Sequence, residues 1–159
     1  MGTSKTEDRI VVLGIRGLGH DEDAVSRRVV ERVAARELPN VVAMAATQLI
    51  PEFATVVASS RATIFVCGGA EQQETVEVRE LFRACPLSRR LHEIGPRELL
   101  ALTRNCYGHS PLAWSVTLPA ARGDGPQRRA RDWEPVIQEA VRGIEQLIQQ
   151  LTTHQVSHA

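Results

Sequence analysis

An uninterrupted apolar run near the start of the chain, residues 9–15 (RIVVLGI), places the strongest constraint on the fold. Its β-branched residues do not alternate with polar ones, which is typical of a strand that is buried on both faces. A loop containing glycine follows, and residues 24–36 then place valines at helical spacing. A strand joined by a short loop to an amphipathic helix is the first half of a βαβ unit. The chain is therefore expected to build a parallel sheet covered by helices.

The rest of the chain continues this alternation of strands and helices. Further strands are predicted at 41–46, 61–67 and 113–118, and further helices at 51–58, 96–105 and 133–151. Residues 75–81 fit an edge strand or a helical turn, and residues 90–94 resemble the end of an extended segment. Such alternation predicts an α/β fold, a three-layer α/β/α sandwich with a mostly parallel sheet of about five strands.

Length and composition limit the classes of protein that the chain can belong to. The 159 residues fit a single domain, with residues 1–8 and 152–159 expected to be flexible tails. The 19 basic and 19 acidic side chains balance, which leaves no general basic surface for nucleic acid or an anionic membrane. No apolar run approaches the roughly 20 residues that span a bilayer. Three cysteines without close pairs favour a reducing compartment, and the cytoplasm is the predicted location.

Chemically active side chains follow several of the predicted strands. Ligands of open parallel sheets bind beside the carboxyl ends of the strands. The acidic cluster Asp21, Glu22 and Asp23, with His20 beside it, follows the first strand; Cys67 ends the third, and His92 follows a later extended segment. Carboxylate, thiolate and imidazole together suit a borderline-soft divalent metal such as nickel or zinc. A carboxylate of this acidic cluster, the thiol of Cys67 and the imidazole of His92 could therefore converge on one metal ion.

Each of these residues also has a simpler interpretation. An acidic run at the start of a helix caps free N–H groups and interacts favourably with the positive end of the helix dipole. Cys67 at the end of an apolar strand is typical of a small buried hydrophobic residue. His92 and His20 fit ordinary histidines of loops. The spacing of these residues alone leaves both interpretations open.

A nucleotide-binding domain is a weaker alternative for the first loop. The pattern Gly14-x-x-Gly17-x-Gly19 is similar to a phosphate-binding loop but lacks the order GxGxxG. The acidic residues at the start of the following helix would also repel a pyrophosphate. We therefore do not expect a dinucleotide site.

Three blocks of the sequence, in this order, resemble the hydrogenase maturation peptidases, which remove a C-terminal extension from the large subunit of nickel-iron hydrogenases. In the first block, RGLGHDED and AVSRRVVERV resemble the family's Leu-Gly-x-Gly-Asn, acidic pair and first helix. The second and third resembling blocks are TQLIPEFATVVASSRATIFVC and HEIGPRELLALTRNCYGHSPLAWSVTLPAA. The resemblance covers residues 9–121 and implies a phosphorylase/hydrolase-like sheet of five strands flanked by helices.

The resemblance also implies roles for individual residues. Asp23, Cys67 and His92 would contact nickel borne by the precursor of the large subunit, or another divalent metal, and water beside the ion would carry out hydrolysis. Cys67 stands where the family has aspartate, Thr47 where it has a histidine, and Arg16 begins the loop where the family has Gly-Asn. The predicted function is an endopeptidase acting on that precursor. These departures leave open a catalytically inactive relative that serves as a binding or assembly module.

Overall fold

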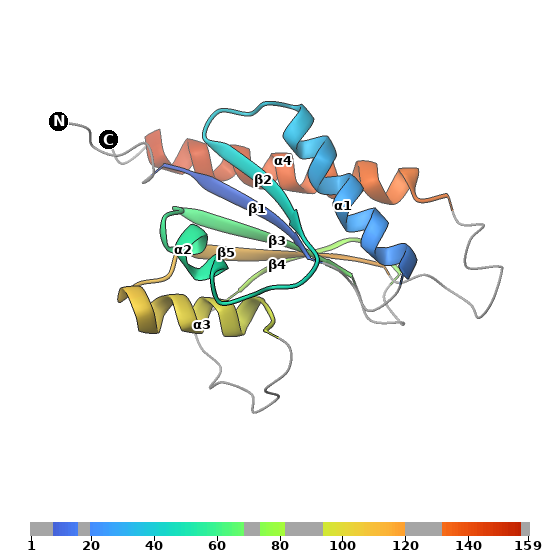
Figure 1. Cartoon of the computed structure of the whole chain (residues 1–159). Helices are drawn as coiled ribbons and strands as arrows, with labels where there is room; N and C mark the ends of the chain where they lie inside the picture. Colours follow the sequence, from blue (N-terminus) through green and yellow to red (C-terminus); the bar gives the residue numbers. More distant parts are fainter. Residues whose placement is uncertain (1–7, 16–19, 69–73, 82–93, 120–131, 157–159) are drawn as a thin grey trace.

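The computed structural model describes residues 8–15, 20–68, 74–81, 94–119 and 132–156, and the side chains of all of these except residues 20–24, 155 and 156 (Figure 1). The chain forms, in order, β1 (Ile10–Ile15), α1 (His20–Ala35), β2 (Val41–Ala46), α2 (Phe53–Ala58), β3 (Ala62–Gly68), β4 (Glu77–Glu80), α3 (Pro96–Tyr107), β5 (Leu112–Leu118) and α4 (Glu134–Val156). Among the described residues, no helix is long and apolar enough to cross a membrane.

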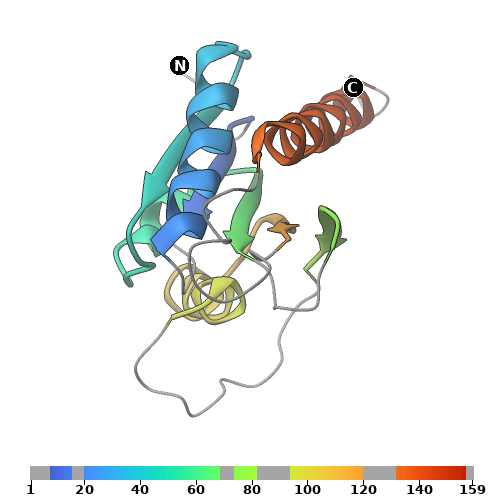
Figure 2. The same ribbon diagram turned by 90° about the vertical axis from the view of Figure 1, so that its right-hand side faces the viewer.

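The five strands form one sheet in the order β2-β1-β3-β5-β4. The first four strands of this order run parallel, and β4 pairs antiparallel with β5 at one edge. Helices α1 and α4 lie on one face of the sheet, and α2 and α3 lie on the other (Figure 2). The predicted three-layer α/β/α sandwich with a mostly parallel sheet of five strands is confirmed.

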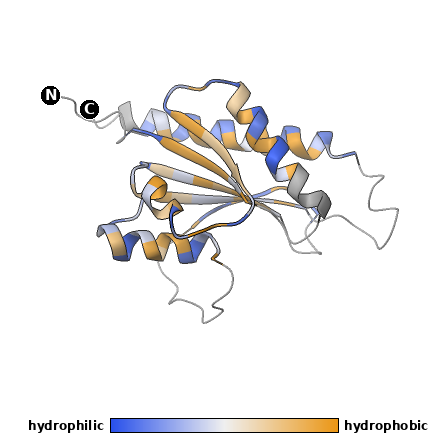
Figure 3. Ribbon diagram, in the orientation of Figure 1, coloured by the Kyte–Doolittle hydropathy of each residue, from blue (hydrophilic) through white to orange (hydrophobic). Residues whose placement is uncertain are grey.

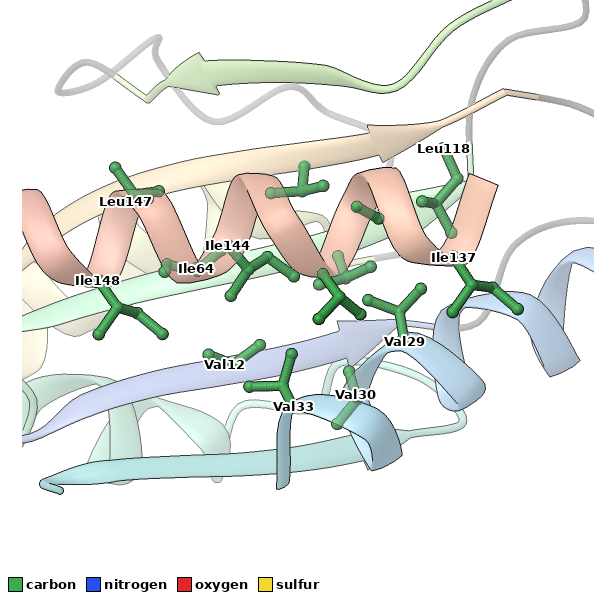
Figure 4. Packing of buried hydrophobic residues seen from close by; sticks show 14 of the residues in the cluster. Val12, Val29, Val30, Val33, Ile64, Leu118, Ile137, Ile144, Leu147 and Ile148 are labelled. Atoms are coloured by element: carbon green, nitrogen blue, oxygen red, sulfur yellow. The ribbon is translucent and has the colours of Figure 1, made fainter. Parts of the chain in front are cut away.

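The sheet is buried on both faces because successive strand residues point to opposite helical layers. In β1, Val12 packs against the α1–α4 layer, whereas Val11 and Leu13 pack against the α2–α3 layer. Apolar residues therefore run continuously along the central strands, while each helix shows one apolar stripe (Figure 3). The valines of α1 and the isoleucines of α4 meet Val12 and Ile64 in the larger core (Figure 4).

Charged side chains join α1 to α4 at the surface of the sandwich. Arg32 donates hydrogen bonds to the carboxylate of Glu134, and Arg28 lies 3.4 Å from the same carboxylate. The hydrogen bond from Arg32 lowers the pKa of Glu134. Arg36 and Glu145 form a second pair at 3.3 Å. Exposed pairs of this kind contribute little to stability, so the apolar contacts beneath them hold the two helices together.

Several boundaries differ from those predicted. Helix α1 begins at His20 rather than residue 24, so the acidic run lies within its first turns and not in a loop. Residues 75–81 contain the edge strand β4, which removes the helical alternative. Of the extended segment predicted at 90–94, only residue 94 lies within the described residues, and it belongs to no strand.

The C-terminal tail predicted for residues 152–159 overlaps the last helix of the structure. Helix α4 continues to Val156. The hydroxyl of Thr152 donates to the carbonyl of Ile148, and that of Thr153 to Gln149, both at 2.8 Å. These bonds satisfy the hydroxyl groups within the helix, although threonine is a weak helix former. The polar composition that suggested a tail is therefore compatible with a last helical turn.

Candidate functional site

The carboxyl ends of three neighbouring parallel strands lie along one edge of the sheet. Ile15 at the end of β1 pairs with Ala46 at the end of β2, and Gly14 pairs with Val66 of β3. The segments that follow these strands, including the start of α1 and the exposed residue Thr47, therefore begin side by side. This edge is where ligands bind in open parallel sheets, and it carries the residues that the sequence nominated after β1 and β3.

Two small residues hold α1 close to β1 and to the end of this strand. A Cβ atom on Gly14 would lie 2.6 Å from Cγ2 of Val30, so only glycine allows α1 to approach β1 this closely. The hydroxyl of Ser26 donates to the carbonyl of Ile15 at 3.1 Å and joins the helix to the end of β1. Neither residue was predicted from the sequence to have this positioning role. A glycine inside a run of bulky strand residues was the available signal.

Asp23, Glu22 and His20 lie in the first turns of α1, directly before the segment that Ser26 anchors. The backbone thus brings these residues to the predicted edge, while their side chains lie outside the described residues. Carboxylates at this end of a helix interact favourably with its dipole, which is the simpler role considered above. The backbone of these residues thus begins a helix at the edge where ligands of open parallel sheets bind.

Cys67 reaches the edge from the opposite face of the sheet. Its side chain is largely buried and packs in the cluster beneath α2 and α3, whereas α1 covers the other face. Burial raises the pKa of the Cys67 thiol to about 12. The group is therefore a neutral thiol at physiological pH, as expected of a small buried hydrophobic residue. To bind a metal it would have to release a proton.

The residues that the structure describes do not by themselves form a metal centre. No group of three or more histidine, cysteine, aspartate or glutamate side chains among them is arranged to hold an ion. His92 and Arg16 lie outside the described residues.

The raised pKa of Cys67 predicts a loss of stability in alkali. Below about pH 8 the thiol stays protonated in both the folded and the unfolded chain, and its contribution to folding stability is fully present. As the pH rises toward 12, the unfolded chain releases this proton before the folded chain does. The contribution of the thiol to the free energy of unfolding is thereby lost. Between about pH 8 and pH 11, wild type should lose about 3 kcal/mol more stability than Cys67→Ser, measured by urea unfolding.

The control for this experiment is Cys106→Ser, because Cys106 is exposed on α3. This variant should follow the wild-type loss of stability across the same pH range. Parallel pH profiles for wild type and Cys67→Ser would show that the Cys67 thiol is not desolvated in the folded protein.

Comparison with known structures supports the fold, whereas comparison of sequences finds no relative. No family model matches the chain, and no curated protein matches it. The crystal structure of a NiFe hydrogenase maturation protease, HycI, from Thermococcus kodakarensis KOD1 is similar, with a TM-score of 0.58 and 16% identity over 91% of this chain and 92% of that one.

A second similar structure is the hydrogenase maturating endopeptidase HybD from E. coli. It has a TM-score of 0.59 and 16% identity over 89% of this chain and 93% of that one. Both matches span nearly the whole of each protein, so they concern the complete sandwich and not a shared βαβ unit alone. The chain therefore has the fold of the hydrogenase maturation proteases, in agreement with the resemblance of its sequence blocks.

Proposed function

We propose that this protein is an endopeptidase of the hydrogenase maturation type, which removes a C-terminal extension from a nickel-loaded hydrogenase large-subunit precursor. The observation that carries the proposal is the fold shared with two maturation proteases over 91% and 89% of the chain. The start of α1, which carries His20, Glu22 and Asp23 on its backbone beside the carboxyl ends of the strands, supports it further. The proposed setting is the cytoplasm.

In this proposal, the nickel ion belongs to the substrate and marks a precursor that is ready for processing. Asp23 and His92 would contact this ion, and Cys67 would add a third donor after losing its proton. Glu22, His20 and Thr47 would be polar neighbours of the ion. We assign no nucleophilic side chain, because a water molecule oriented beside the ion can attack the peptide bond.

The test is direct cleavage of the precursor. The full-length protein is incubated with nickel-loaded large-subunit precursor, and the mass of the precursor is followed by mass spectrometry. We expect loss of the C-terminal extension, and no loss when the precursor is prepared without nickel. An unchanged precursor mass at stoichiometric protein would contradict the peptidase function.

The state of Cys67 favours one second candidate, a catalytically inactive binding or assembly module. A buried neutral thiol occupies the position where the resemblance expects a carboxylate. A thiol orients water less effectively than a carboxylate. A neutral thiol also gives the proposed set of metal donors one negative charge fewer than a carboxylate would. Under this alternative, the precursor co-elutes with the protein in gel filtration while its mass stays unchanged. Under the peptidase proposal, the processed precursor appears and is released.

A further inference from the structure

We propose that Ser26 is a positioning residue for the reaction, whose hydroxyl fixes the first turns of α1, and with them the backbone of Asp23, at the carboxyl end of β1. Ser26 itself would touch neither the precursor nor its ion. The inference rests on the proposed function, because it adds a residue on which recognition of the nickel-loaded precursor depends. Loss of this hydroxyl should displace the backbone of Asp23 without removing any proposed contact to the ion.

The hydroxyl of Ser26 makes its hydrogen bond at the point where the pairing of β1 with β3 ends. β1 pairs with β3 as far as Gly14, and Ile15 is the next and last residue of the strand. Ser26 donates to the carbonyl of Ile15 at 3.1 Å, and the residue is only 2% exposed. A buried carbonyl that loses its donor costs more free energy than an exposed one. The bond therefore resists movement of the helix away from the end of the strand.

Hydroxyl groups in the other long helices form bonds of a different kind. Thr103 of α3 donates to the carbonyl of Leu99, four residues earlier in the same helix. Thr152 of α4 bonds the carbonyl of Ile148 in the same way. Such bonds stay inside one helix and position nothing outside it. The bond from Ser26 spans eleven residues of the chain and joins a helix to a strand.

The periodicity of α1 places Asp23 on the same side of the helix as Ser26. Residues three positions apart share one face and lie about 5 Å apart along the helix axis. Ser26 contacts Ile15, and Val30 lies over Gly14, so α1 runs back along β1 in the opposite direction. Position 23 therefore continues the sheet-facing side of α1 beyond the end of β1. A shift of the first turns would move the backbone of Asp23 directly.

Amide hydrogen exchange tests this positioning without any need for peptidase activity. Exchange in the full-length wild type and in Ser26→Ala is followed by mass spectrometry. The amides of residues 24–27 bond to carbonyls of the first turn, and we expect them to exchange about fivefold faster in the variant. The amides of residues 31–35 should keep their wild-type rates. This contrast would show a local loosening of the start of α1.

Ser60→Ala is the matched control for Ser26→Ala. Ser60 is also buried, and its hydroxyl donates to the carbonyl of Val57 at 2.7 Å. It lies just before β3, at the amino ends of the strands and thus at the opposite end of the sheet. Ser60→Ala should therefore leave exchange in α1 unchanged. Ser26→Cys replaces Ser26→Ala if the latter folds poorly, because a thiol fills the space but is a weak donor.

Two results of the exchange experiment would overturn the inference. Wild-type exchange of residues 24–27 in Ser26→Ala would show that the hydroxyl does not hold the start of α1. Equally faster exchange along the whole of α1 would show a general loss of stability and no local role.

Steady-state cleavage of the nickel-loaded precursor tests the connection to the reaction. We expect kcat/KM of Ser26→Ala to fall about tenfold, mainly through a higher KM, because the precursor carries the ion that Asp23 is proposed to contact. Ser60→Ala should keep the wild-type values. Unchanged kinetics of Ser26→Ala, or a fall in kcat alone, would contradict the positioning role. Absence of cleavage by wild type would instead contradict the proposed function, and hydrogen exchange would then decide by itself whether Ser26 holds the start of α1.

Discussion

Replacing Gly14 by alanine is expected to destabilise the protein by about 2–3 kcal/mol. The new Cβ would lie 2.6 Å from Cγ2 of Val30, which is a buried side chain with a stiff χ1 angle. Helix α1 would therefore have to shift away from β1 and weaken the bond between Ser26 and Ile15. Urea unfolding measures the loss, which should also lower the melting temperature by roughly 5–10 °C.

A second glycine provides the matched control for Gly14→Ala. A Cβ on Gly143, inside α4, would meet only Cγ2 of Val78 at 3.5 Å, an ordinary contact. Gly143→Ala should therefore stabilise the protein by up to about 1 kcal/mol, because alanine is the better helix former. The double variant Gly14→Ala with Val30→Ala should lose less stability than the sum of its parts. Equal effects of the two glycine substitutions would contradict the close approach of α1 to β1.

Replacing Asp23 or His92 by alanine is expected to reduce cleavage of the nickel-loaded precursor by on the order of 100-fold or more. Even residues that only orient metal ligands cost about 10–100-fold when they are removed, and these two are proposed to contact the ion directly. The measurement is the initial rate at which the extension is released, followed by mass spectrometry. Unfolding curves of the variants should stay close to that of wild type.

Matched control variants distinguish the effect of losing a site residue from the effect of losing any carboxylate or imidazole of the chain. Glu31→Ala removes another carboxylate from α1, on its exposed surface beside Arg27. His154→Ala removes an exposed imidazole near the end of α4. Both control variants should process the precursor at the wild-type rate. Full activity in Asp23→Ala or in His92→Ala would remove that residue from the proposed site.

The central strands could be predicted from the sequence because burial on both faces leaves a simple pattern. β1 and β3 follow the predicted apolar runs to within one residue, since each run consists of residues that both helical layers can bury. The helix ends were harder to predict. The glycines at 17 and 19 suggested a loop, yet α1 already begins at His20. Local polarity does not distinguish the first turn of a helix from the loop before it.

The sequence predicted which edge of the sheet carries the candidate site, but not which side-chain contacts form there. Strand order and parallel direction bring the ends of β1 and β3 together, as the alternating pattern indicated. The pattern could not tell which face Cys67 would take, because a strand with two apolar faces has no polar side to orient it. The structure places Cys67 on the α2–α3 face, opposite to α1. The thiol of Cys67 is neutral because of this packing, which the spacing of residues in the sequence does not predict.

The most direct test of a metal-recognising site at this edge is a crystal structure with bound nickel, in which Ni²⁺ stands in for the ion of the precursor. Anomalous diffraction at the nickel absorption edge locates the ion without assumptions about its ligands. We expect one peak beside the carboxyl ends of β1 and β3, about 2.0–2.2 Å from a carboxylate oxygen of Asp23 and an imidazole nitrogen of His92. A peak elsewhere on the molecule, or Asp23 and His92 held on separate sides of the sheet, would contradict it.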